Sequence, residues 1–199
     1  MGNLMNLKNE ELHGKIVEAA GELFKQQGFE KTTMEQVAAE AMTSHETLYN
    51  YFPVKEALAE AYFRVISKNI ARATLESVPT LPDTRSRLIA AISSIYEWSE
   101  LNPDLARVVI IYRLKIRGAC KLFEEIGTQS IIADILHRGR DAGELRNDIP
   151  FEMILAYIDY LGSAILLDWL RNNGQGNLRK QIVPVVDMIL FGIPGKPET

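Results

Sequence analysis

The chain has little chemistry of the kinds that bind metals or form disulfides. It contains one cysteine, Cys120, in 199 residues, which rules out an intramolecular disulfide and suits a reducing cytoplasm. Its three histidines, His13, His45 and His137, are scattered and give no zinc-ligand spacing. A phosphate-cradling glycine loop, a nucleophile elbow and an HExxH helix are also missing. We therefore expect no metal, no cofactor and no enzymatic activity.

Membrane and secretion signals are weak as well. The first fifteen residues lack an apolar core segment, so we expect no secretory signal peptide and place the protein in the cytoplasm. Residues 151–170 are apolar enough to suggest a membrane span, but Glu152, Asp159 and Asp168 interrupt them. Carboxylates inside a span oppose insertion by roughly several kcal/mol in total, and we expect no membrane partner.

Positive charge is scarce in residues 1–55, the part of the sequence that is otherwise most informative. The whole chain has a net charge of −4, and residues 1–55 carry five lysines, no arginine and eight glutamates, which gives −3. Since cationic side chains supply most non-specific affinity for DNA, this deficit lowers the expected affinity. It does not exclude binding, because neutral donors also hold phosphates.

What is present is helical periodicity. An apolar stripe predicts a first helix from about residue 9 to 27, ended by Gly28. Either Thr32 with Glu35 or Thr33 with Gln36 forms a capping box for a short second helix. Ser44 caps a third helix over about 45–51, and a fourth helix runs from about 55 to 77.

The rest of the chain also reads as helical. We expect helices over about 84–101, 103–117, 120–142, 151–172 and 177–191, with Pro184 kinking the last one. The run LARVVIIYRLKIR could be a strand, but no second strand candidate exists to pair with it. The sequence thus predicts an all-α fold of about nine helices.

Residues 16–55, and above all TLYNYFP at 47–53, closely resemble the N-terminal domain of the tetracycline-repressor (TetR) family of transcriptional regulators. The resemblance implies a DNA-binding head at 1–55, with its helix-turn-helix at about 33–52. It implies a ligand-binding and dimerisation domain at 56–199. By the same resemblance, the DNA-contacting residues would be Thr33, Thr43, Ser44, His45, Thr47, Tyr49, Asn50, Tyr51 and Lys55.

Within that set, Lys55 looks like the family's phosphate-contacting lysine, and Asn50 and His45 are the best candidates for base readers. Met42 departs from the pattern, because the family usually has glycine in this turn. A left-handed backbone there would cost about 1 kcal/mol against glycine; the alternative is a slightly different turn. Glu46 has two interpretations as well, pairing with the helix dipole or accepting from cytosine N4.

In the resembled family the body encloses a pocket for a small-molecule inducer. Aromatic and apolar side chains that would line it are Tyr62, Ile66, Trp98, Tyr112, Phe123 and Tyr157; ordinary core filling is the alternative for each. The helix over 151–172 is apolar nearly all round, so it must bury more than one face. In the family, the last two helices form a four-helix dimer interface, here Ile154, Ile158, Leu161, Ile165, Val186 and Ile189. The alternative is a two-sided core helix in a monomer.

Together with these patterns, the resemblance implies a homodimeric transcriptional regulator that binds a palindromic operator in double-stranded DNA. It would be a repressor released from DNA by a small molecule. The alternative is a dimeric ligand-binding or protein-interaction module of the same fold that binds DNA weakly.

Overall fold

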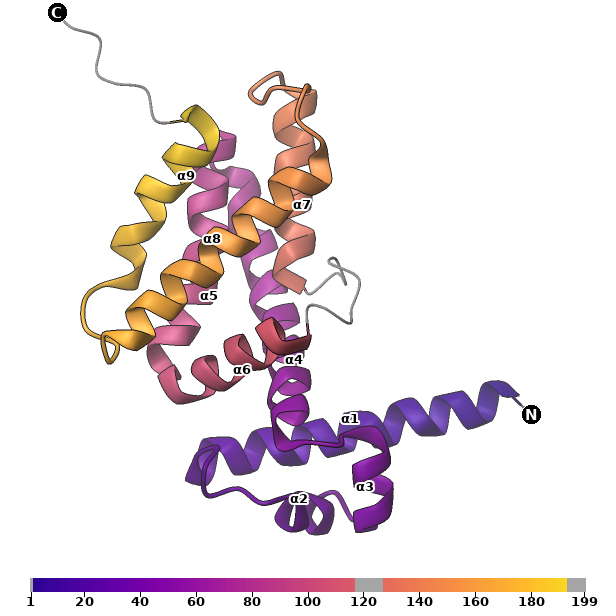
Figure 1. The fold of residues 1–199 in the computed structure, drawn as a ribbon. Coiled ribbons are helices and arrows are strands. Elements are labelled where there is room, and N and C mark those ends of the chain that lie inside the picture. Colours follow the sequence, from indigo (N-terminus) through magenta and orange to yellow (C-terminus); the bar gives the residue numbers. More distant parts are fainter. Residues whose placement is uncertain (1, 117–126, 193–199) are drawn as a thin grey trace, which may run out of the picture. The chain divides into compact units, whose positions relative to one another are not determined.

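The computed structural model describes residues 2–116 and 127–192, and all regular secondary structure in this part of the chain is helical (Figure 1). The helices are α1 (Gly2–Gln27), α2 (Met34–Glu40), α3 (His45–Tyr51), α4 (Lys55–Ser77), α5 (Thr84–Leu101), α6 (Pro103–Ile116), α7 (Gly127–Asp141), α8 (Phe151–Arg171) and α9 (Ile182–Phe191). Two 3₁₀ turns, η1 (Val78–Thr80) and η2 (Leu178–Gln181), join them. The all-α prediction is confirmed, and the described part of the run LARVVIIYRLKIR lies in the helix α6 rather than in a strand. Helix α6 is only partly buried, since Ile111 and Leu114 are exposed.

Two compact units make up the chain. Unit 1 comprises Met1–Val65 and Asp104–Ala119, and unit 2 comprises Ile66–Pro103 and Cys120–Thr199. Helix α4 therefore contributes its first half to unit 1 and its second half to unit 2. The domain boundary predicted after residue 55 stays a prediction.

The core of unit 1 forms between α1, α2, α3 and the start of α4. Ile16 and Ala20 from α1, Val37 from α2 and Leu48 from α3 are each 0% exposed, as their apolar spacing predicts. Helix α1 begins at Gly2, earlier than the predicted residue 9, because the apolar stripe marks only the packed part of a helix. Close packing of α4 on α1 depends on Gly21, where an added Cβ would lie 2.3 Å from Cε2 of a tyrosine ring.

Helix α5 is the centre of unit 2 and packs against α7, α9 and both 3₁₀ turns. Arg85 on α5 forms two hydrogen bonds, of 2.5 and 3.0 Å, to the carboxylate of Asp187 on α9. Helix α8 packs on α7 and η2. A long side chain also links α8 to α5, because the Tyr96 hydroxyl donates to the Gly162 carbonyl over 3.0 Å.

The C-terminal helices correct two predictions. The last helix begins at Ile182 rather than at about 177, because residues 178–181 form η2. Pro184 therefore lies in the first turn of α9, where a missing N–H breaks no helical hydrogen bond, so it has no reason to kink the helix. Of the helix predicted over 120–142, the described part is α7, and residues 117–126 lie outside the described residues.

Candidate nucleic-acid interface

Side-chain caps fix the start of α2 and of α3. Thr33 accepts a hydrogen bond from the Gln36 amide (3.2 Å), and the Gln36 side chain accepts one from the Thr33 amide (2.9 Å). This settles the choice of capping box, because Thr32 is buried and donates instead to the Gly28 carbonyl over 2.8 Å. Ser44 caps α3 by accepting from the Thr47 amide at 3.1 Å. Both helices of the helix-turn-helix thus begin at residues that the sequence marks.

The turn between α2 and α3 has the left-handed backbone that usually selects glycine. Met42 has φ +50°, and it is one of two non-glycine residues with positive φ in the described part of the chain. The Met42 amide donates to Ala39 O (3.1 Å) and the Thr43 amide to Ala38 O (2.9 Å). The Met42 side chain is 94% exposed. The first of the two interpretations of this turn is therefore correct: Met42 follows the backbone path of a glycine.

Helix α3 divides into a buried and an exposed face. Leu48 lies in the core, while His45, Glu46, Tyr49 and Asn50 are exposed; we call these four residues the α3 reading surface. Of the other predicted DNA contacts, Thr33 and Ser44 are exposed, and Thr43, Thr47, Tyr51 and Lys55 are half-buried. The structure therefore brings the nine predicted residues to the first turn of α2, the turn, α3 and the start of α4.

One residue of this region was not predicted from the sequence. The carboxylate of Glu35, in the first turn of α2, lies 3.1 Å from Nε2 of His45. The imidazole of His45 also contacts the ring of Tyr49, with 4.5 Å between centroids. Only the capping pattern drew attention to Glu35 in the sequence, and the contact spans ten residues. His45 is thus held from two sides.

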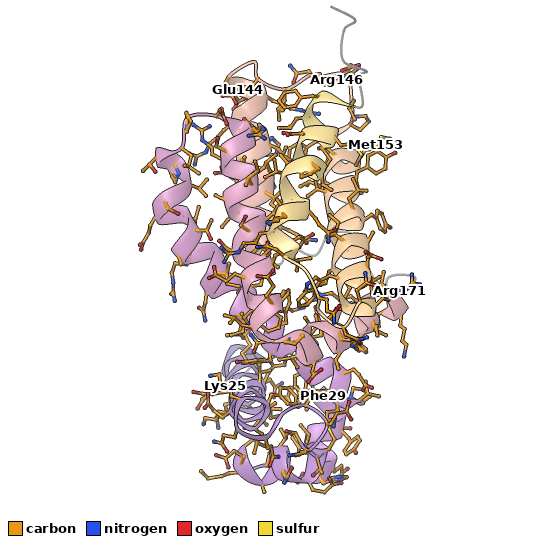
Figure 2. The ribbon with its side chains drawn as sticks, turned by 90° about the vertical axis from the view of Figure 1, so that its left-hand side faces the viewer. Lys25, Phe29, Glu144, Arg146, Met153 and Arg171 are labelled. Carbon is orange, nitrogen blue, oxygen red and sulfur yellow. The ribbon has the colours of Figure 1, made fainter. Side chains whose placement is uncertain are left out.

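Lys55 has a structural role that the resemblance did not suggest. Its ammonium donates to the carbonyls of Phe29 and Thr32, each over 2.8 Å, and lies 4.2 Å from the centroid of the Phe29 ring. Figure 2 labels Phe29 in the loop between α1 and α2. Lys55 therefore ties α4 to this loop, and its contact with a DNA phosphate stays a prediction.

A buried ion cluster joins α4 to α6 within unit 1. Glu60 is only 5% exposed. Its carboxylate accepts two hydrogen bonds from Arg113, of 2.7 and 3.2 Å, and one of 3.1 Å from Arg64. The guanidinium of Arg113 also lies 4.6 Å from the centroid of the Phe63 ring. Such a carboxylate is strongly destabilising unless its partners stay in place.

The residues predicted for the ligand pocket belong to two different units of the chain. Tyr62 packs against α1 in unit 1, where burial raises the pKa of its hydroxyl. Tyr112 is also in unit 1, whereas Ile66, Trp98 and Tyr157 belong to unit 2. Tyr157 is 55% exposed, and Phe123 lies outside the described residues. Neither Tyr62 nor Tyr157 lines the interior of unit 2, and the pocket stays a prediction.

The six residues predicted for the dimer interface differ in how far they are buried. Ile158 and Val186 are 6% and 1% exposed, so they pack inside unit 2 and are not free to meet a partner. The other four, Ile154, Leu161, Ile165 and Ile189, are half-buried. Apolar residues that sequence reasoning did not select are exposed on these helices: Met153, Tyr157 and Tyr160 on α8, and Val183 and Phe191 on α9.

Part of the apolar surface of α8 is therefore not covered by other described residues of the chain. Figure 2 shows the side chain of Met153 on the outer side of the helix. Only 22% of the most apolar window of α8 is buried. By length and composition α8 is the one described helix that could cross a membrane, a test that core helices of soluble proteins also pass.

The capped α2–turn–α3 module has the layout of a helix-turn-helix, the DNA-binding motif of many transcriptional regulators. Residues 16–62 match the family model described as bacterial regulatory proteins, tetR family. Over these residues the chain is similar to the TetR family, whose members are transcription regulators.

Individual proteins show how far the similarity extends. The nucleoid occlusion factor SlmA of Haemophilus influenzae is 28% identical over 116 residues, which are 58% of this chain and 50% of SlmA. The chain therefore spans about half the length of the curated relatives that it matches first.

Two solved structures share the fold over nearly the whole chain. FadR of Thermus thermophilus, a TetR-family transcriptional repressor in complex with lauroyl-CoA, has a TM-score of 0.76 at 23% identity. That alignment covers 94% of this chain and 98% of FadR. FadR of Bacillus subtilis, in complex with stearoyl-CoA, has a TM-score of 0.65 at 21% identity, with 90% and 98% covered.

Proposed function

We propose that this protein is a cytoplasmic, homodimeric repressor that binds a palindromic operator through α3 and leaves it when a small molecule binds the helical body. The observation that carries the proposal is the α3 reading surface. It presents an imidazole, a phenol and an amide from one short helix whose opposite face is locked in the core. The amide can pair with an adenine edge in the major groove, and the carboxylate of Glu46 can accept from cytosine. The phenol and the imidazole can hydrogen-bond phosphates or bases.

A mobility-shift assay with duplex DNA from the gene's own upstream region tests the DNA-binding part. Asn50 can pair bidentately with adenine, and its replacement by alanine should weaken binding to the selected duplex by about 1–3 kcal/mol, or roughly 5- to 150-fold. Binding to a random duplex should change little. A folded wild-type chain that binds no duplex would favour the alternative, a dimeric ligand-binding or protein-interaction module. The net charge of −3 over residues 1–55 is the observation that keeps this alternative open.

The occupant that we propose for the exposed face of α8 and α9 is a second copy of this chain. Half-sites of a palindrome need two heads related by two-fold symmetry. The exposed apolar residues lie on α8 and α9, which follow one another along the chain through η2, and three acidic residues on α8 make a lipid environment unfavourable.

The variant Tyr157→Glu tests this surface. Tyr157 is exposed in the single chain, so a charge there should leave the fold intact and still be buried unpaired in a dimer. Sedimentation should show a folded monomer. The matched control is Leu101→Glu, at the C-terminal end of α5, which is 76% exposed and lies outside α8 and α9. A Tyr157→Glu protein that remains dimeric would place the interface elsewhere.

For the ligand we propose a fatty acyl-CoA. Support comes from the two FadR structures of similar fold, whose ligands are lauroyl-CoA and stearoyl-CoA. It also comes from α5 and α8, where many apolar residues are only half-buried, among them Ile92, Ile95, Leu161 and Ile165. Apolar side chains that are only half-buried are accessible enough to contact an aliphatic tail.

Calorimetry with lauroyl-CoA, and with free CoA as the control, tests this ligand class. Lauroyl-CoA should bind and weaken operator binding by roughly 5- to 150-fold, and operator should weaken lauroyl-CoA binding by the same factor. Equal affinity for lauroyl-CoA with and without operator would refute the induction mechanism. Heat of binding from CoA alone would refute the acyl chain as the recognised part.

A further inference from the structure

Glu35 has no role in the proposed function described above, although its position and its contact are both suited to one. It places a carboxylate on the side of α2 that adjoins the α3 reading surface, and it contacts the one imidazole on that surface. We infer that Glu35 is a specificity-determining residue, which holds His45 in one orientation for base reading and repels the phosphates of every duplex. This inference rests on the proposed DNA-binding function.

Further hydrogen bonds hold the Glu35 carboxylate in its contact with His45. The amide of Glu35 itself and the hydroxyl of Thr33 hydrogen-bond the carboxylate and lower its pKa below the usual value, with a smaller contribution from His45. Glu35 is therefore ionised at neutral pH. Its side chain is 69% exposed and that of His45 is 53% exposed, so both face the solvent that DNA would replace.

His45 is held on a second side, which makes its orientation specific. The ring contact with Tyr49, one turn further along α3, favours the side-chain angles in which the two rings touch. A polar side chain that is already oriented loses less conformational entropy when it hydrogen-bonds a base. That gain appears only on a duplex that offers the matching base edge.

The repulsive part acts on every duplex alike. Cations that would offset it are few, because the head has five lysines against eight glutamates and the ammonium of Lys55 is bonded to loop carbonyls. An exposed carboxylate within a Debye length, about 8–10 Å, of phosphates weakens binding without regard to sequence. On a random duplex, Glu35 contributes only repulsion and lowers the affinity. On the matching duplex, the orientation of His45 offsets part of that repulsion, so the affinity falls less.

The experiment compares Glu35→Gln with Glu18→Gln, which removes the same charge from an exposed position on α1. Two probes are used at fixed salt: a duplex that the wild-type chain selects from a random library, and an unselected random duplex. Glu35→Gln should raise affinity for the random duplex by roughly 3- to 10-fold. The ratio of specific to random affinity should fall by at least about 3-fold. Glu18→Gln should leave that ratio unchanged within about 2-fold.

A second background separates positioning from charge alone. In His45→Ala protein, adding Glu35→Gln should still raise affinity for random DNA but should no longer change the ratio. An unchanged ratio in Glu35→Gln, or an equal fall in the His45→Ala background, would overturn the inference while leaving DNA binding established. Failure of the folded wild-type chain to bind either duplex would instead overturn the proposed function.

Discussion

Replacing Met42 by glycine should stabilise the DNA-binding head. Met42 has φ +50°, and a left-handed backbone costs an L-residue roughly 1–2 kcal/mol because Cβ approaches the following carbonyl oxygen. Glycine avoids that cost but loses about 0.5–1 kcal/mol more backbone entropy on folding. The two ranges together give a net gain of about 0–1.5 kcal/mol, with a central value of about 0.75 kcal/mol. No packing is lost, since the Met42 side chain is 94% exposed.

The matched control is Met42→Ala. It removes the same exposed side chain but keeps Cβ, so its stability should stay within about 0.5 kcal/mol of the wild type. Both backbone hydrogen bonds of the turn, from Met42 and Thr43, remain possible in either variant. The difference between the two variants isolates the Cβ strain.

Amide hydrogen exchange is the suitable assay, because it resolves the head from the rest of the chain. Both tryptophans, Trp98 and Trp169, belong to unit 2, so their fluorescence does not report on the head. The protection factor of the buried Leu48 amide should rise by roughly 2- to 5-fold in Met42→Gly, which corresponds to a gain near the central value of about 0.75 kcal/mol. Equal protection in the glycine and alanine variants would show that the turn carries no such strain.

Three further predictions concern charged groups. Lys55→Met should lower the unfolding free energy of the head by about 2 kcal/mol, measured with urea, since two charge-assisted hydrogen bonds to the loop are lost; unchanged stability would leave Lys55 only a phosphate role. Glu60→Met should cost roughly 3–5 kcal/mol by leaving a buried arginine unpaired, whereas adding Arg113→Met should recover much of it; a thermodynamic cycle of melting curves checks this. Arg85 lowers the pKa of Asp187, so this pair stabilises the fold above the unfolded pKa of about 3.9 and loses that contribution as pH falls. Acid titration of tryptophan fluorescence should therefore show a transition that Asp187→Asn reduces, and an identical titration would exclude the pair as its cause.

The head could be predicted in detail because its signals are local. Thr33 and Ser44 mark helix starts through hydrogen bonds that reach three residues along the chain. Gly28 has the left-handed φ of +83° that ends α1. The left-handed backbone at Met42 was one of two interpretations that the sequence offered, because glycine is usual at this position of the turn. Each of these features depends on neighbours within a few residues, which is what a single sequence displays.

Tertiary contacts could not be predicted from the same sequence. Lys55 bonds carbonyls 23 and 26 residues away, and nothing local distinguishes that use of a lysine from binding a phosphate. Helix α8 is apolar on most of its circumference, so periodicity could not show that Ile158 faces its own unit while Tyr157 faces outward. Only the positions of the neighbouring helices decide this.

The charge of the head also makes two heads necessary for useful affinity. One head offers few free cations, because Lys55 is bonded to a loop and Lys15 and Lys25 pair with glutamates on their own helix. With two or three phosphates neutralised per subunit, a dimer should show a slope of log affinity against log salt of about −4 to −5. A single head would have roughly half that slope and a correspondingly weak affinity. Joining two such heads makes the second binding event intramolecular, which raises overall affinity by about 10²- to 10⁴-fold without a new contact. A weak head is therefore compatible with operator binding only if the chain pairs, and the exposed apolar face of α8 and α9 is the surface that we propose for that pairing.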